Sequence, residues 1–181
     1  MTIAFRGPLN EKNATAVGIS GSPSNQSRSR GLLDHALRRL GDYNVPTTLI
    51  DLAELPADAL LGRRPDAGVQ HALTQVERSA ILVASTPVYR ATYTGLLKVF
   101  FDLFPQRALA GKVALGIATG AAGEHRIVID QGLRPLFASV NAEVVPGIYA
   151  TDADLANAER RAAILEQIDR AISEAMRLSS A

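Results

Sequence analysis

The chain has 181 residues, 19 of them Lys or Arg and 18 Asp or Glu, and its formal net charge is +1. This length suits one domain with a sizeable core, and the near-neutral balance provides no field that would attract nucleic acid or an anionic membrane. The chain contains no cysteine, which excludes disulfides, thiolate metal sites and cysteine nucleophiles. No apolar run approaches the roughly 20 residues of a membrane span, so we expect a cytoplasmic protein.

The beginning of the chain differs in pattern from the rest. Residues 1–15 mix Gly7, Pro8 and scattered charges without any period, and we interpret them as an N-terminal arm outside the core. From residue 16 onward, short apolar runs alternate with longer amphipathic stretches, a rhythm typical of βαβ units. We therefore predict one α/β domain over residues 16–181.

The first half of this domain contains two predicted strands and one predicted helix. A short β-branched run predicts a strand at 16–20, buried on both faces, and apolar residues at helical spacing predict a helix over 29–40. A second strand is expected at 47–52. The connection over 53–66 is long and contains two prolines, and connections of this kind tend to lie over a site or an interface.

The second half begins with a helix over about 68–79 that leads into the most hydrophobic run of the chain, at 80–85. We expect this run to be the central strand of the sheet. The helix predicted over 95–104 is apolar over most of its circumference, which is too much for one core face, so we expect part of it to contact another subunit. The remaining predicted elements are a strand at 112–118, a helix at 125–139, a short strand at 143–145 and a helix at 154–178.

Five strands alternating with five helices predict a three-layer sandwich, in which right-handed helical crossovers join parallel strands. In such sheets ligands bind beyond the carboxyl ends of the strands, where the strand order reverses. We therefore expect the functional residues in the loops that follow the first, third and fourth strands.

The loop after the first strand, SGSPSNQSRS at 20–29, combines several serines with Arg28 at the start of a helix. Hydroxyls, free N–H groups at a helix N-terminus and an arginine suit a dianionic phosphate. The loop lacks the glycine and lysine pattern of nucleotide-binding motifs. From Ser22 to Ser29 it has the spacing of a phosphatase loop with serine in place of the cysteine nucleophile, so we expect binding without cleavage. The alternative is an ordinary polar turn capped by serine.

Two further loops complete the predicted site. The segment TPVYRATYTGLLK at 86–98 carries Tyr89 and Tyr93, against which a flat ring system could lie, unless both tyrosines only cap the core. The segment ATGAAGEH at 118–125 consists of small residues that allow a ligand to approach the backbone, although any tight turn between a strand and a helix can have this composition.

Three stretches together carry a family resemblance: GSPSNQSRS, TPVYRATYTGLLKVFFDLFPQRALAGKVALGIATG and DQGLRP. From about residue 16 to 150 the chain resembles the NADPH-dependent FMN reductases of the flavodoxin-like proteins, and most closely the reductase partners of alkanesulfonate and methanesulfonate monooxygenases. The resemblance implies a flavodoxin-like sandwich with a five-stranded parallel sheet in the order 2-1-3-4-5. It also implies that FMN and NADPH or NADH are the cofactors. The apolar helix at 95–104 and the interrupted stretch at 132–135 predict a homodimer, and the resemblance implies a homotetramer as the alternative.

The resemblance also assigns site residues. The FMN phosphate and ribityl end would be held by Ser20, Ser22, Ser27, Arg28 and Ser29. The isoalloxazine ring would be lined by Pro87, Val88, Tyr89 and Arg90, and closed on its other side by Thr119, Gly120 and Ala121. NAD(P)H would pass a hydride to flavin N5, so no catalytic side chain and no metal site is expected.

Two departures leave the fate of the flavin open. The third loop reads ATGAA, without a second glycine after Gly120, and in DQGLRP Gln131 stands where the sulfonate-linked reductases carry an inserted residue in a widened helical turn. In those reductases that turn is associated with flavin leaving as a product. The resemblance as a whole implies that reduced flavin passes to a partner monooxygenase. The alternatives are a reductase that keeps FMN and reduces a quinone, azo compound or metal ion, and a flavodoxin-type carrier, which the near-neutral charge disfavours.

Overall fold

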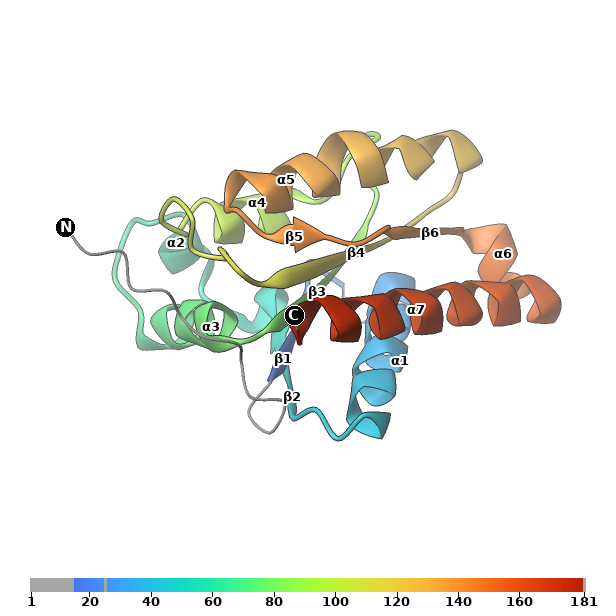
Figure 1. The fold of residues 1–181 in the computed structure, drawn as a ribbon. Coiled ribbons are helices and arrows are strands. Elements are labelled where there is room, and N and C mark those ends of the chain that lie inside the picture. Colours follow the sequence, from blue (N-terminus) through green and yellow to red (C-terminus); the bar gives the residue numbers. More distant parts are fainter. Residues whose placement is uncertain (1–14, 25, 181) are drawn as a thin grey trace.

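A parallel sheet forms the centre of the molecule (Figure 1). The computed structural model describes residues 15–24 and 26–180, so residues 1–14 of the expected arm lie outside the described residues. Within those described ranges the strands are β1 Ala16–Ser20, β2 Thr47–Asp51, β3 Ile81–Pro87, β4 Val113–Gly120, β5 Glu143–Val144 and β6 Ile148–Thr151. Their order is β2-β1-β3-β4-β5, with β6 also pairing with β4, which confirms the predicted order.

The edge beyond β4 differs from the prediction because a further strand, β6, follows the expected one. β5 pairs with the start of β4 and β6 pairs with its end, and Pro146 and Gly147 lie between the two strands. Pro146 has no N–H group for the hydrogen-bond ladder. Gly147 passes so close to β4 that a Cβ atom built there would lie 2.9 Å from the carbonyl oxygen of Gly116. β6 was not predicted, and it brings further residues to the edge of the sheet where the three loops lie.

Helices cover both faces of the sheet. They are α1 Arg28–Asp42, α2 Ala57–Leu60, α3 Ala67–Arg78, α4 Gly95–Phe101, α5 Arg134–Ser139, α6 Asp152–Ala156 and α7 Ala158–Ser179. Short α2 and a 3-10 turn at Leu52–Glu54 occupy the long connection after β2. No helix among the described residues is long and apolar enough to cross a membrane.

Alternating residues of each buried strand fill two separate cores. In β3, Leu82 and Ala84 belong to the core beneath α3, α4 and α5, whereas Ile81 and Val83 belong to the core beneath α1 and α7. Figure 1 shows these layers, with α4 and α5 on one side of the sheet and α1 and α7 on the other. Because successive side chains of a strand point to opposite faces, a continuous apolar run supplies both cores.

The two helices predicted near the end of the chain are both interrupted. The expected helix at 125–139 consists of a 3-10 turn at Gly123–Ile127, a π-helical turn at Ile129–Leu133 and then α5. A π-helical turn is therefore present at the place that the sequence left open, and it contains Gln131. The final helix is divided at Asn157, whose extended backbone ends α6 and whose side chain accepts a hydrogen bond from the N–H of Arg160 in α7.

The apolar helix α4 buries most of its large side chains within the single chain. Phe100 makes an edge-to-face contact with Phe104, which lies just beyond the end of α4, with ring centroids 5.4 Å apart, and Leu97 is fully buried. Leu96 and Val99 are only half-buried. The expected contact with another subunit at this helix stays a prediction.

Thr94 connects three parts of the fold immediately before α4. Its buried hydroxyl donates to the carbonyl oxygen of Gly21 at 2.6 Å and accepts from the N–H of Leu97 at 3.2 Å. Its own N–H donates to the hydroxyl of Thr86 at 3.1 Å. One residue thus joins the loop after β1, the end of β3 and the first turn of α4.

Replacing Thr94 by valine keeps the shape of the side chain and removes its hydroxyl. The Gly21 carbonyl and the Leu97 N–H then lose their partner, and we expect the free energy of unfolding to fall by about 1–3 kcal/mol. Urea denaturation measures this change. Thr94→Ser retains the hydroxyl and should recover most of the loss; equal stability of the valine variant and the unaltered protein would contradict the role of Thr94.

Candidate functional site

The three loops singled out in the sequence meet at one edge of the sheet. Ser20 at the end of β1 pairs with Ser85 of β3, and Pro87 at the end of β3 pairs with Thr119 of β4. A cavity of about 400 Å³ opens between the loops. Its lining consists of Ser22, Ser24, Gln26, Ser27 and Arg28 from the first loop, Pro87, Val88 and Tyr89 from the second, Thr119, Gly120 and Ala121 from the third, and Asp152.

Most of the residues expected at the site line this cavity, and three do not. Ser20 and Ser29 are buried beneath it, and the hydroxyl of Ser29 lies 2.8 Å from that of Ser27. Arg90 is exposed on the turn that follows Tyr89. The sequence analysis did not include Ser24, Gln26 and Asp152 among its site residues. Asp152 directly follows β6, the strand that the sequence analysis missed.

The N-terminus of α1 lies at one end of the cavity. Ser27 stands at the N-cap of α1, yet its hydroxyl makes no capping bond to the helix backbone. The first N–H groups of a helix have no partner within it, and the helix dipole places partial positive charge there. The hydroxyl of Ser22 is used within the loop, because its oxygen accepts a hydrogen bond from the N–H of Ser24 at 3.1 Å. The free donors at this end therefore come from the first turn of α1.

An ion pair borders the same end. The guanidinium of Arg28 lies 2.5 Å from the carboxylate of Asp152, and the two side chains are 61% and 41% exposed. Pairs as exposed as this one contribute little to stability because water screens them. Arg28 is therefore free to turn toward another anion, for which Asp152 would be a competitor.

At the other end, Tyr89 lies on a tight hairpin turn. Its N–H donates to the carbonyl of Thr92 at 3.0 Å, and the N–H of Thr92 donates back at 3.2 Å. The two residues between them, Arg90 and Ala91, have φ angles of 52° and 65°, a region that residues other than glycine, asparagine and aspartate seldom adopt. The turn holds a tyrosine that is 52% exposed at the cavity wall.

The third loop depends on Tyr149 of β6, which the sequence analysis missed. The Tyr149 hydroxyl donates to the carbonyl of Ala122 at 2.5 Å. A Cβ atom at Gly120 would lie 2.6 Å from that hydroxyl oxygen and 3.3 Å from Cβ of Val88, so close packing requires glycine at this position. The N–H of Val88 also donates to the carbonyl of Thr119 at 2.7 Å, which joins the second and third loops.

Burial is the largest influence on the Tyr149 hydroxyl, and it raises the pKa of this group. The negative charges of Asp152, Glu124 and Asp154 raise the pKa further. The phenol therefore keeps its proton, and its hydrogen bond to Ala122, throughout the neutral pH range.

The residues at the cavity provide no catalytic pair of nucleophile and base. The ionisable side chains in its lining are Arg28, Tyr89 and Asp152. His125, on the 3-10 turn after the third loop, does not line the cavity, and its buried Nδ1 atom has no hydrogen-bond partner among the described residues. In the part of the chain that the structure describes, no group of three or more His, Asp or Glu residues could hold a metal ion. The arrangement suits binding and orientation of an anionic ring compound.

Comparison with known proteins gives consistent results. Residues 14–155 match the model of a family described as NADPH-dependent FMN reductase. An FMN reductase (NADPH) of Pseudomonas putida is 41% identical over 145 residues, which are 79% of this chain and 74% of that protein. The NADH-dependent FMN reductase SfnE of Pseudomonas putida is 38% identical over 156 residues, 83% of this chain and 81% of the relative. The apo structure of an NADH:FMN oxidoreductase, EMOB, covers 93% of this chain and 90% of its own, with 34% identity and a TM-score of 0.83.

The raised pKa of Tyr149 predicts how stability depends on pH. The folded protein holds the phenolic proton more tightly than the unfolded chain, so this contribution is complete below the unfolded pKa of about 10 and is lost as the pH rises through the folded value. Tyr149→Phe removes it, and should lower the free energy of unfolding by about 1 kcal/mol at pH 8 and reduce the decline above pH 10. Urea denaturation at several pH values measures both effects; an unchanged alkaline decline in the variant would contradict them.

Proposed function

The chain belongs to the NADPH-dependent FMN reductase family and is an NAD(P)H-dependent FMN reductase with a flavodoxin-like fold, and from this premise we propose that the cavity between its three loops is the flavin site. The observation that carries this proposal is the polarity of the cavity. One end combines the N-terminus of α1 with serines and Arg28, and the other end presents Tyr89 and small residues. FMN has the same division between its phosphate and its ring.

The residues at the first end fit a phosphomonoester. We assign the phosphate to the first N–H groups of α1, the hydroxyl of Ser27 and the guanidinium of Arg28, because charge-assisted hydrogen bonds favour a dianion there. Ser22 would hold the loop in shape and contact the ribityl end. Ser20 and Ser29, which are buried beneath the cavity, would support the loop from below.

The residues at the second end fit a flat ring. Pro87, Val88 and Tyr89 would line one side of the isoalloxazine, and Thr119, Gly120 and Ala121 would close the other. Arg90 on the strained turn would act at the mouth of the cavity, where a second nucleotide enters. Tyrosine supplies a large apolar face at little cost in side-chain entropy, which suits ring binding.

The bound flavin would supply the redox chemistry by accepting a hydride from NADPH or NADH. The protein's contribution is then positional and electrostatic. Backbone N–H groups of the third loop would stabilise negative charge on a reduced ring, because in the second loop the N–H groups of Val88 and Tyr89 already bond to carbonyl groups of the protein. The exposed Tyr89 would leave one side accessible to the nicotinamide, and the tight contact between Gly120 and Tyr149 keeps the third loop in place.

We further propose that reduced flavin passes to a partner monooxygenase and that the enzyme works in the cytoplasm as a homodimer or homotetramer, with residues 16–181 as its flavin-binding domain and residues 1–15 as an arm. The π-helical turn at Ile129–Leu133 supports transfer of flavin, because the resemblance to sulfonate-linked reductases associates such a turn with flavin release. The half-buried Leu96 and Val99 on α4 support a subunit contact.

Titration of the purified apoprotein with FMN, followed by kinetics with NADPH and NADH, tests the function. If flavin is a diffusing substrate, we expect the rate of nicotinamide oxidation to rise with added FMN and to be negligible without it. FMN that stays bound through dialysis would favour a reductase that keeps its flavin. Failure of FMN to bind would contradict the assignment of the cavity.

The ion pair between Arg28 and Asp152 predicts how substitutions at these two residues change FMN affinity. Arg28→Ala removes a cation from the phosphate end and should weaken FMN binding about tenfold. Asp152→Asn removes the competing carboxylate and should tighten FMN binding about two- to fivefold, as expected for exposed charge pairs. Isothermal titration calorimetry measures both changes.

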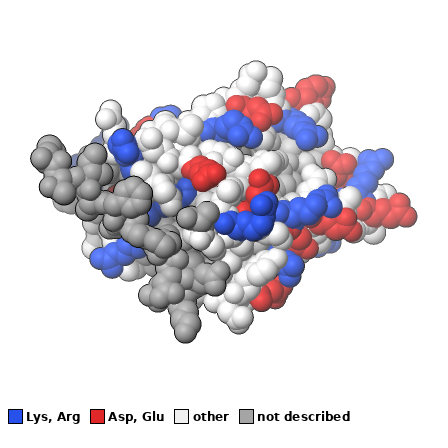
Figure 2. All heavy atoms as spheres, viewed as in Figure 1, with Lys and Arg blue, Asp and Glu red and all other residues white. Residues whose placement is uncertain are grey.

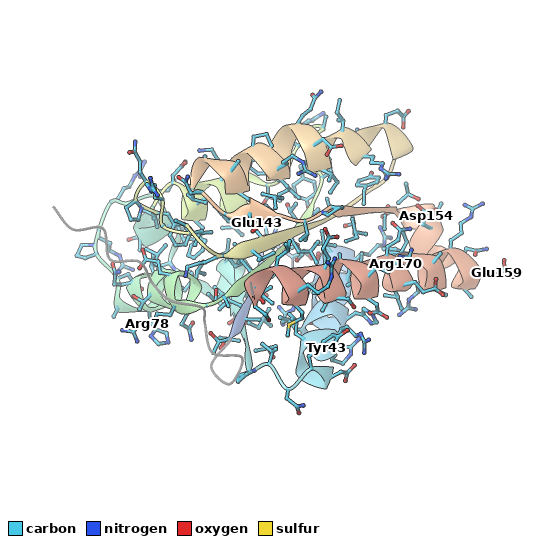
Figure 3. All side chains as sticks on the ribbon, in the orientation of Figure 1. Tyr43, Arg78, Glu143, Asp154, Glu159 and Arg170 are labelled. Atoms are coloured by element: carbon cyan, nitrogen blue, oxygen red, sulfur yellow. The ribbon has the colours of Figure 1, made fainter. Side chains whose placement is uncertain are left out.

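Glu159→Gln is the matched control for Asp152→Asn. It removes the same charge at the start of α7, where Figure 3 labels Glu159, and this residue does not line the cavity. FMN affinity should therefore be unchanged in this variant. Weaker FMN binding by the Asp152→Asn protein would show that the carboxylate supports the phosphate site instead of competing with the ligand.

A further inference from the structure

A second groove adjoins the proposed flavin site on the outside of α1. It has a volume of about 350 Å³ and lies between α1 on one side and α6 and the start of α7 on the other. Arg28 and Asp152 line both this groove and the flavin cavity, so the two spaces meet at the ion pair. The groove thus begins at the end of the cavity that we assign to the flavin phosphate.

The groove has an apolar floor. Leu32 of α1 is buried, and Leu155 of α6 and Leu165 of α7 are half-buried. Ala156 is exposed and small, which leaves the space open. The volume lies within the range of about 300–1,000 Å³ typical of small-ligand sites, and an apolar floor with a few polar groups is the usual composition of such sites.

The sides of the groove carry two arginines without acidic partners. Arg38 and Arg161 line the groove, and neither forms an ion pair with another described residue. Nearby arginines differ, since Arg39 contacts two carboxylates and Arg160 lies 3.8 Å from Asp154. Elsewhere on the face that carries α7, basic and acidic side chains are interspersed (Figure 2).

Two polar contacts hold the helices that form the groove. His35, which lines it, bonds through Nε2 to Asp169 of α7 at 2.8 Å. The Tyr43 hydroxyl at the end of α1 lies 2.9 Å from that of Ser173, and Figure 3 shows Tyr43 beside α7. The groove is therefore held open by fixed walls.

We propose that, when the flavin is FAD, this groove binds its adenosine monophosphate half. The inference rests on the proposed function, because it requires the flavin phosphate at the start of α1. The second phosphate of FAD would then lie between Arg28 and Arg161. The adenine would lie on the apolar floor beside Arg38, whose planar guanidinium can stack on a flat ring.

NADPH also carries an adenosine phosphate, but its geometry fits the groove less well. The nicotinamide has to reach the flavin ring at the Tyr89 end of the cavity, whereas the groove opens at the phosphate end. A dinucleotide that continues from the flavin phosphate enters the groove directly. We therefore assign the groove to FAD, and the test includes NADPH as the competing source.

Titrations of the unaltered protein and its variants with FMN and with FAD test this assignment, followed by flavin fluorescence. Arg161→Ala and Arg38→Ala should each weaken FAD binding about tenfold and leave FMN binding unchanged. Ala156→Trp fills the groove without removing a charge, and should cause the same selective loss. Arg170→Ala is the matched control, because it removes the same charge from α7 outside the groove and should affect neither flavin (Figure 3).

The outcomes separate this inference from the function on which it rests. Selective loss of FAD binding supports the groove. FAD binding that is unchanged in the Arg161→Ala and Ala156→Trp proteins, or weakened equally with FMN binding, would overturn the groove alone. A raised KM for NADPH with FMN as acceptor, with FAD binding unchanged, would assign the groove to the nicotinamide nucleotide and overturn the inference. Failure of the unaltered protein to bind either flavin would overturn the proposed function as well.

Discussion

The hydroxyl of Thr94 joins the two loops between which the proposed flavin site lies. It bonds to the carbonyl of Gly21 in the first loop, and the Thr94 N–H bonds to Thr86 at the end of β3. A buried carbonyl without a partner is costly, so the loops cannot separate without loss of stability. The Val88 N–H extends the connection to Thr119, which brings the third loop into the same unit. The two ends of the cavity are therefore held at a fixed distance from each other.

The sheet and its order follow from short-range features that a sequence displays. Apolar runs such as the one that forms β3 fill two cores at once, so they have no polar alternation and are easy to recognise. The short β6 is different, because it alternates buried and half-buried residues over four positions and follows Pro146 and Gly147. Its omission also removed Tyr149 and Asp152 from the expected site, since both lie on or directly after this strand.

The site itself was predictable to the level of loops, and less so to the level of side chains. Composition placed serines and an arginine before α1, but could not tell that Ser20 and Ser29 turn into the core while Ser24 and Gln26 line the cavity. That choice depends on hydrogen bonds between near neighbours and on the direction in which the loop enters the helix. The ion pair between Arg28 and Asp152 joins residues far apart in the sequence, so no local sequence pattern predicts it.

The break at Asn157 divides the C-terminal region into two helices, α6 and α7, and substitutions in α7 have different consequences from substitutions in α6. The family match ends at residue 155, whereas Arg161 and Leu165, on the far wall of the outer groove, lie beyond it on α7. If the groove binds the AMP half of FAD as proposed, substitutions on this helix would change the affinity for FAD without disturbing the three loops proposed to hold the FMN moiety. On the proposed assignment of the groove, a preference for one flavin over another would depend on residues of a single surface helix.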